Sequence, residues 1–186
     1  MSRGNRSMST LNISFVPHIQ ILRGRASPKR ASDTGGHEQS YDFNAQNLSS
    51  MLTDILIAST GDAPEILSAA SGSWPRLQFN SLDNMALAGL WSALGGTGAV
   101  DFEGEKYLLA HTEERWVFEF PQDFVQRLSA VQSGAVAEVA MSWAKHDELV
   151  HMGADGPGVE PVVEAMSGFA RQAIGQGKSL LLFMCL

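Results

Sequence analysis

Apolar residues at spacings of three and four predict helices along most of the chain. The first predicted helix covers about residues 44–59 and stops at Thr60 and Gly61. Further helices are predicted just after Pro64, over about 82–94 between a Ser81 N-cap and a Gly95 stop, over about 121–131 with Pro121 at the first helical position, over about 134–151 after Ser133, and over about 161–174.

Other stretches carry the patterns that are typical of strands. Apolar and polar residues alternate over 11–22, which predicts a strand with one buried face. Residues 76–79 form a brief candidate strand, and residues 107–110 and 115–120 are predicted to pair as a hairpin. Residues 179–186 are an almost unbroken apolar run of strand length. Such a run is expected in the middle of a sheet, where both faces are buried.

Together these elements predict one α+β domain over residues 11–186, with five to six helices packed on a small mixed or antiparallel sheet. Residues 1–10 are expected to form a disordered basic N-terminus, because they are polar and positively charged with little to anchor them. A mobile basic loop is expected at about 23–39, where Arg, Ser, Gly and Lys are frequent. Residues 152–158 contain three glycines and a proline, so we expect a turn there.

Positive charge is concentrated at the start of the chain. Six of the 13 basic residues come before the first acidic residue, Asp33, so this start carries +6. The rest holds 7 Lys/Arg and all 20 Asp/Glu, which gives −13 within a total of −7. An acidic body lacks the concentrated Lys and Arg that phosphate contacts require, so no nucleic-acid partner is expected. The basic start fits an arm for an anionic partner, a targeting segment or a solvated loop.

The cysteine content and the hydropathy limit the compartments in which the protein is expected. Cys185 is the single cysteine, which allows no intramolecular disulfide and no cysteine-based metal framework. This composition fits a reducing compartment, and we expect a cytoplasmic protein. No stretch reaches the roughly 20 apolar residues that span a bilayer, so no membrane association is expected. Nothing in the sequence indicates a cofactor.

The segment from His146 to His151 carries the most suggestive chemistry. Its histidines are five residues apart, which places them on different sides of a helix, unlike the four-residue spacing of zinc proteases. Glu148 and His151 share a helix face, and so do Asp147 and His151. The candidate catalytic residues are therefore Asp147, Glu148 and His151, and the candidate metal ligands are His146, Glu148 and His151.

A structural role competes with that interpretation. If one helix ran through this segment, Asp147 would point toward the apolar face that includes Trp143 and Val150. A buried carboxylate needs a partner, and His151 lies one turn further on. We therefore expect Asp147 to be buried and paired, unless the helix ends before it.

The candidate partner-binding residues lie elsewhere. Trp74 is expected to be exposed, because it precedes a proline in a Ser/Gly-rich loop. The basic candidates lie in the expected loop and are Arg23, Arg25, Lys29 and Arg30.

No motif identifies an activity. The glycines at 95, 96 and 98 follow a predicted helix, so they indicate a helix stop and not a phosphate loop. We expect a small soluble protein-binding domain without catalytic activity, whose partner is another protein. The alternatives are a small metal-assisted hydrolase that uses the segment from His146 to His151, and an anion-binding protein that uses the basic loop.

Overall fold

A five-stranded antiparallel sheet is the centre of the structure, a computed structural model that describes residues 52–68, 74–80 and 82–185. The strand order is β2-β1-β5-β4-β3, and every neighbouring pair is antiparallel. The strands are β1 (Leu52–Ala58), β2 (Arg76–Asn80), β3 (Leu108–His111), β4 (Arg115–Glu119) and β5 (Ser179–Cys185). The predicted α+β class is confirmed, with the antiparallel form of the sheet.

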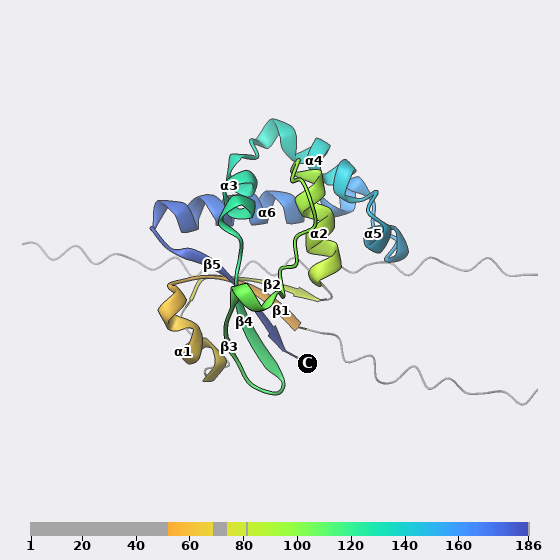
Figure 1. The fold of residues 1–186 in the computed structure, drawn as a ribbon. Helices are drawn as coiled ribbons and strands as arrows, with labels where there is room; N and C mark the ends of the chain where they lie inside the picture. The colour runs from red at the N-terminus through yellow and green to blue at the C-terminus, as the bar shows by residue number, and fades with distance from the viewer. Residues whose placement is uncertain (1–51, 69–73, 81, 186) are drawn as a thin grey trace, which may run out of the picture.

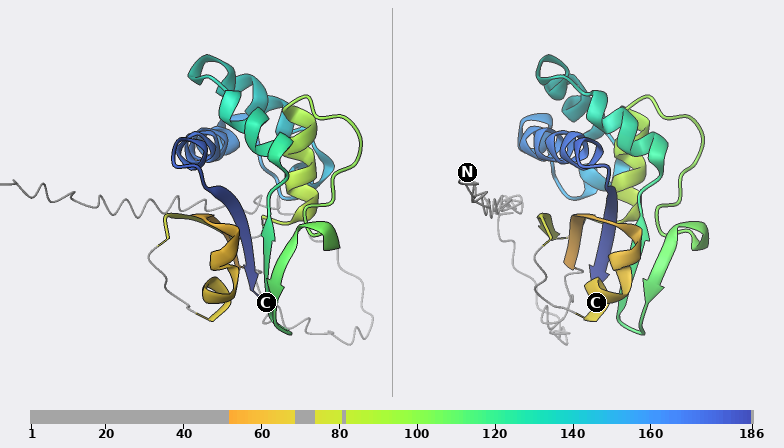
Figure 2. Two further views of the ribbon diagram at one scale, coloured as in Figure 1. Left: turned by 60° about the vertical axis from the view of Figure 1, so that its left-hand side comes forward. Right: turned by 90° about the vertical axis from the view of Figure 1, so that its left-hand side faces the viewer.

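The described residues form six α-helices, five of which lie on one side of the sheet (Figure 1). Helices α2–α6 share the larger hydrophobic core with one face of the sheet, and α1 packs against the opposite face (Figure 2). The helices are α1 (Ala63–Ser68), α2 (Asn84–Ala93), α3 (Gln122–Ala130), α4 (Val136–Trp143), α5 (Asp147–His151) and α6 (Gly156–Gly175). Short 3-10 turns are η1 (Thr60–Asp62), η2 (Glu105–Tyr107) and η3 (Ser133–Ala135). None of the helices in the described ranges is long and apolar enough to cross a membrane.

Strand β5 is buried on both faces because it lies in the middle of the sheet. Leu180, Leu182 and Met184 belong to the core beneath helices α2–α6, whereas Leu181 belongs to the smaller cluster beneath α1. A strand with two buried faces has no need for polar residues at alternate positions. The central position predicted from the apolar run is therefore confirmed.

Strand β1 replaces part of the helix that was predicted over residues 44–59, so that prediction is wrong for residues 52–58. Ile55 and Ile57 face helices α2–α6, while Leu56 and Ala58 face α1. Burial on both faces removes the alternation that marks a half-exposed strand, and the remaining apolar spacing matches a helix by coincidence.

The ends of two helices differ from the prediction. The side chain of Asp83 accepts a hydrogen bond from the Ala86 N–H at 2.8 Å, so Asp83 and not Ser81 caps α2. Gly95 ends this helix as predicted, with a φ of 73° that suits glycine. Helix α6 begins at Gly156, five residues before the predicted start, because Asp155 caps the Gly158 N–H at 2.7 Å. The turn predicted over 152–158 is therefore confined to its first half.

Three further predictions concern residues that the structure does not describe. The strand over 11–22, the disordered terminus over 1–10 and the basic loop over 23–39 all lie outside the described ranges.

Candidate functional site

The segment from His146 to His151 does not form the continuous helical face that was predicted. Helix α4 ends at Trp143, and His146 has an extended backbone with φ −68° and ψ 139° before α5 begins. Asp147 and His151 are both exposed, and neither side chain makes a hydrogen bond or ion pair within the described residues. The exception to the expected burial and pairing of Asp147 therefore applies, because α4 ends before Asp147 and a separate helix begins there.

The same break separates the candidate metal ligands. Glu148 is half-buried in α5, His151 is exposed, and the His146 ring turns toward α2. Within residues 52–68, 74–80 and 82–185, no three side chains of His, Cys, Asp or Glu are grouped so that they could hold a metal ion. The hydrolase alternative therefore has no ligand set in this part of the chain.

His146 has a packing role at the junction of α2 and α5. Its ring lies so close to Gly89 that a methyl group there would be 2.5 Å from Cγ. Its Nδ1 is buried and has no hydrogen-bond partner. This contact places the start of α5 against α2 and leaves His146 half-buried.

The candidate partner-binding residues are only partly described. Trp74 is half-buried against the smaller cluster beneath α1, so the expectation that it would be exposed is wrong. The four basic candidates, Arg23, Arg25, Lys29 and Arg30, lie outside the described ranges.

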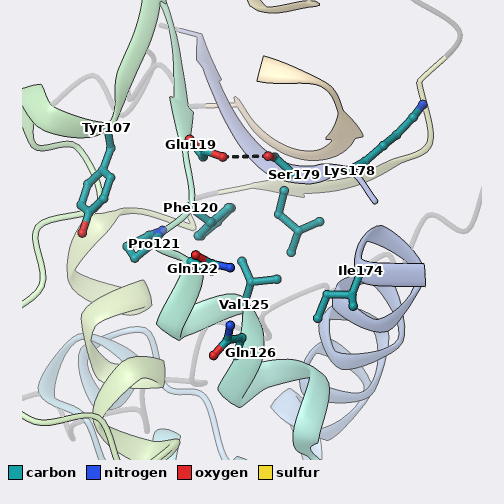
Figure 3. A pocket seen from close by; sticks show the side chains of 11 residues that line it. Tyr107, Glu119, Phe120, Pro121, Gln122, Val125, Gln126, Ile174, Lys178 and Ser179 are labelled. Carbon is teal, nitrogen blue, oxygen red and sulfur yellow. Dashed lines mark hydrogen bonds between the residues drawn. The ribbon is translucent and has the colours of Figure 1, made fainter. Parts of the chain in front are cut away.

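A groove of about 490 Å³ lies where the end of β4 and helix α3 meet the end of α6 and the start of β5 (Figure 3). Its volume falls within the roughly 300–1,000 Å³ that is typical of ligand sites. The lining comes from separate segments of the chain: Tyr107; Glu119, Phe120, Pro121, Gln122, Val125 and Gln126; and Ile174, Lys178, Ser179 and Leu180.

The floor of the groove is apolar and tightly packed. Phe120, Val125 and Leu180 are all buried. The rings of Phe120 and Phe124 are stacked with centroids 5.3 Å apart, and the Phe102 ring meets Phe124 edge-on at 4.9 Å. Such aromatic contacts hold a surface in place, so the floor is formed without a ligand.

One wall of the groove exposes apolar surface to water. The Ile174 side chain on α6 is 50% exposed, and Figure 3 shows it facing Val125 of α3 across the groove. An apolar residue that lines a concave surface is a stronger sign of a contact site than one on a convex surface.

The upper end of the groove is polar. The Ser179 hydroxyl donates a hydrogen bond to Glu119 Oε1 at 2.7 Å. Glu119 is half-buried and forms no ion pair within the described residues. Lys178 also lines the groove, but its side chain extends away from Glu119 (Figure 3). Among the residues that the structure describes, Glu119 is therefore a carboxylate without a counter-ion beside apolar surface.

Two acidic residues near the start of α2, Asp101 and Glu103, interact with Asn84 within the fold. The Asn84 side chain donates to Asp101 Oδ1 at 3.0 Å and accepts from the Phe102 N–H at 2.8 Å. Burial raises the pKa of Glu103, the backbone N–H of Asn84 lowers it, and Asp101 and Asp83 raise it further. These groups fasten the loop before η2 to the helix, because their polar atoms bond to one another.

A third charged group lies on the α1 side of the sheet. Arg76 Nη1 lies 3.3 Å from Asp54 Oδ2, and the Asp54 side chain is almost fully buried. Burial raises the pKa of Asp54, and this effect outweighs Arg76 and Gln78, which lower the pKa. The pair joins β1 to β2 and does not line the groove.

No local pattern in the sequence indicates the groove. Its residues come from η2, from β4 and α3, and from α6 and β5, so only the packing of these elements brings them together. The local signal at residues 146–151 was stronger in the sequence, yet it corresponds to a packing contact.

Fold and groove define an α+β domain with a central antiparallel sheet and a surface groove that has an acidic end. Comparison with protein-family models, with curated proteins and with solved structures finds no match to the chain. The function therefore has to be argued from the chain's own residues.

Proposed function

We propose that the chain is a small soluble protein-binding domain without catalytic activity, and that its partner is a protein with a basic surface. The observation that carries this proposal is the groove between α3 and α6. It combines a preformed apolar floor, the half-exposed Ile174 and the carboxylate of Glu119, which forms no ion pair within the described residues. Apolar surface and a small number of placed polar or charged groups are the usual components of a recognition site.

The charge of the described residues supports a basic partner. Their sequence contains 17 Asp/Glu and 7 Lys/Arg, which gives −10 for these residues. A net charge of this sign attracts a basic surface over distance and speeds the encounter, mainly at low salt.

The chemistry of the groove supports binding more than catalysis. The hydroxyl of Ser179 is engaged with the Glu119 carboxylate, and the residues that line the groove include no histidine and no cysteine. A serine nucleophile needs a base that takes up its proton, and a carboxylate alone is a weak base at neutral pH.

Panning a random peptide library against the purified protein tests the proposal. We expect enriched peptides to combine apolar and basic residues. Ile174→Arg should abolish their binding, because it places a bulky cation at the groove. Val150→Arg is the matched control, since Val150 is an equally exposed apolar residue on α5. No enrichment, or equal loss in both variants, would contradict the proposal.

We also propose that the domain works in the cytoplasm. The support is the cysteine content, because a chain whose single cysteine is Cys185 can form no intramolecular disulfide. Fractionation of the source cells tests this, and recovery of the protein outside the cytoplasmic fraction would contradict it.

A further inference from the structure

We propose that the groove binds an arginine side chain of the partner, with the guanidinium at Glu119 and the stem along the apolar wall. This inference rests on the proposed function, because it names the group that a partner protein would place in the groove. It assigns separate roles to the two ends of the site, and each role can be tested separately.

Glu119 has the capacity to receive a cation. A carboxylate offers about four acceptor positions on its two oxygens, and the Ser179 hydroxyl occupies one of them. The Ser179 bond also fixes the orientation of the carboxylate at the end of the groove (Figure 3). A guanidinium donates two parallel hydrogen bonds to a carboxylate, which matches the positions that remain.

Two lysines among the described residues lie near the groove, and both are directed away from Glu119. Lys178 follows the glycine turn at the end of α6, is exposed and extends away from Glu119 (Figure 3). Lys106 lies next to Tyr107 in the sequence, and its Nζ is 4.6 Å from the centroid of the Tyr107 ring. Neither lysine forms an ion pair with Glu119.

The apolar part of the groove suits the stem of an arginine. Arginine side chains bury their methylene groups along apolar surface and keep the charged head at a polar position. Val125 and Ile174 provide such a surface below Glu119 (Figure 3). Because stacked Phe120 and Phe124 hold the floor in place, the ordering cost of binding falls mainly on the ligand.

A peptide series tests the inference on the full chain. The probe is a short Gly/Ser peptide with a central Leu-Arg-Leu, and binding is followed by NMR titration of the backbone amides. We expect shifts at the amides of Glu119, Val125 and Ile174. The same peptide with citrulline, the neutral isostere of arginine, should bind about tenfold to a hundredfold more weakly, as expected for loss of a hydrogen-bonded charge.

Protein variants distinguish binding at the groove from a general electrostatic attraction to the acidic protein. Glu119→Gln keeps an acceptor for Ser179 and should weaken the arginine peptide by a similar factor, while the citrulline peptide should be unaffected. Glu138→Gln makes the same change of charge at an exposed position on α4 and should leave affinity within about twofold, because exposed charges interact weakly. Lys178→Gln should leave the affinity unchanged or increase it.

Each outcome decides one of the two proposals. If Glu119→Gln binds the arginine peptide as tightly as the wild type while Ile174→Arg abolishes binding, the arginine assignment is wrong and the protein-binding function stands. Equal weakening by Glu119→Gln and Glu138→Gln would also overturn the assignment. If no peptide of the series or of the random library binds, both proposals fail.

Discussion

The imidazole of His146 lies against the backbone of Gly89, so that a methyl group on Gly89 would be 2.5 Å from Cγ and 2.8 Å from Nδ1. This contact joins α2 to the start of α5, and it leaves His146 half-buried with its Nδ1 enclosed. Glycine is required at position 89 because only a residue without Cβ leaves room for the ring.

Gly89→Ala should therefore lower the free energy of unfolding by about 1–3 kcal/mol, as overpacking does. Alanine favours a helix over glycine by about 1 kcal/mol, so the collision has to outweigh that gain. Gly168→Ala is the matched control on α6, where the nearest side-chain atom is 4.0 Å away, and it should stabilise the protein. Urea unfolding measures both, and equal effects would show that the His146 contact does not form.

Asp54→Asn should stabilise the protein at neutral pH. Burial raises the folded-state pKa of Asp54 above the unfolded value, so the folded state binds its proton more readily. The resulting penalty is full above the folded pKa and disappears as the pH falls below the unfolded value. The stability difference between variant and wild type should accordingly shrink from pH 7 toward pH 4.

Exposed Asp147 provides the control for that experiment. Asp147→Asn removes the same charge at the start of α5 and should change stability by less than about 1 kcal/mol. A destabilisation by Asp54→Asn at neutral pH would mean that the pairing with Arg76 outweighs the cost of burial.

Ending the chain after Ser179 should abolish cooperative folding. The lost residues supply the pairing of both β1 and β4 and apolar burial on two faces. Leu182→Ala is a milder test and should cost about 2–5 kcal/mol, since Leu182 is only 1% exposed. Leu52→Ala, at the exposed start of β1, should cost much less. A truncated chain with a sharp thermal transition would contradict the central role of β5.

Trp143→Phe should lower stability by about 1–3 kcal/mol. The indole Nε1 donates to the Ala86 carbonyl at 2.8 Å inside the core, and phenylalanine cannot replace this bond between α4 and α2. Trp74→Phe should cost less, because Trp74 is half-buried and makes no side-chain hydrogen bond within the described residues. Thermal unfolding of both variants measures the two losses of stability. A larger loss for Trp74→Phe would show that the Trp143 hydrogen bond does not stabilise the core.

The reliability of the sequence-based prediction depended on whether local residues decide the structure. Strand β5 was predicted correctly, because an apolar run of strand length that follows a glycine turn suits a buried strand. Strand β1 was missed, because burial on both faces removes the alternation of a half-exposed strand and the remaining apolar spacing matches a helix. Its buried Asp54 pairs with Arg76 of β2, a tertiary contact that leaves no trace in the local pattern.

The helix boundaries on either side of residues 146–151 show the same limit. No glycine or proline lies between Trp143 and Asp147, so no helix-breaking residue indicates the break between α4 and α5. At Gly156 the opposite error occurred, since glycines and Pro157 indicated a turn while Asp155 was already acting as an N-cap. The groove could not be predicted for a different reason, because the groove depends on how α3 meets α6 and not on any single segment.

The central position of β5 also sets the order in which the sheet is completed. The β1–β2 pair and the β3–β4 pair share no hydrogen bonds with each other, and β5 is the last of the five strands to be synthesised. While it is missing, β1 and β4 each expose an unpaired edge, a template for pairing with other chains. Protection from aggregation on the ribosome would therefore be needed until residues 179–185 have emerged and inserted between the two pairs.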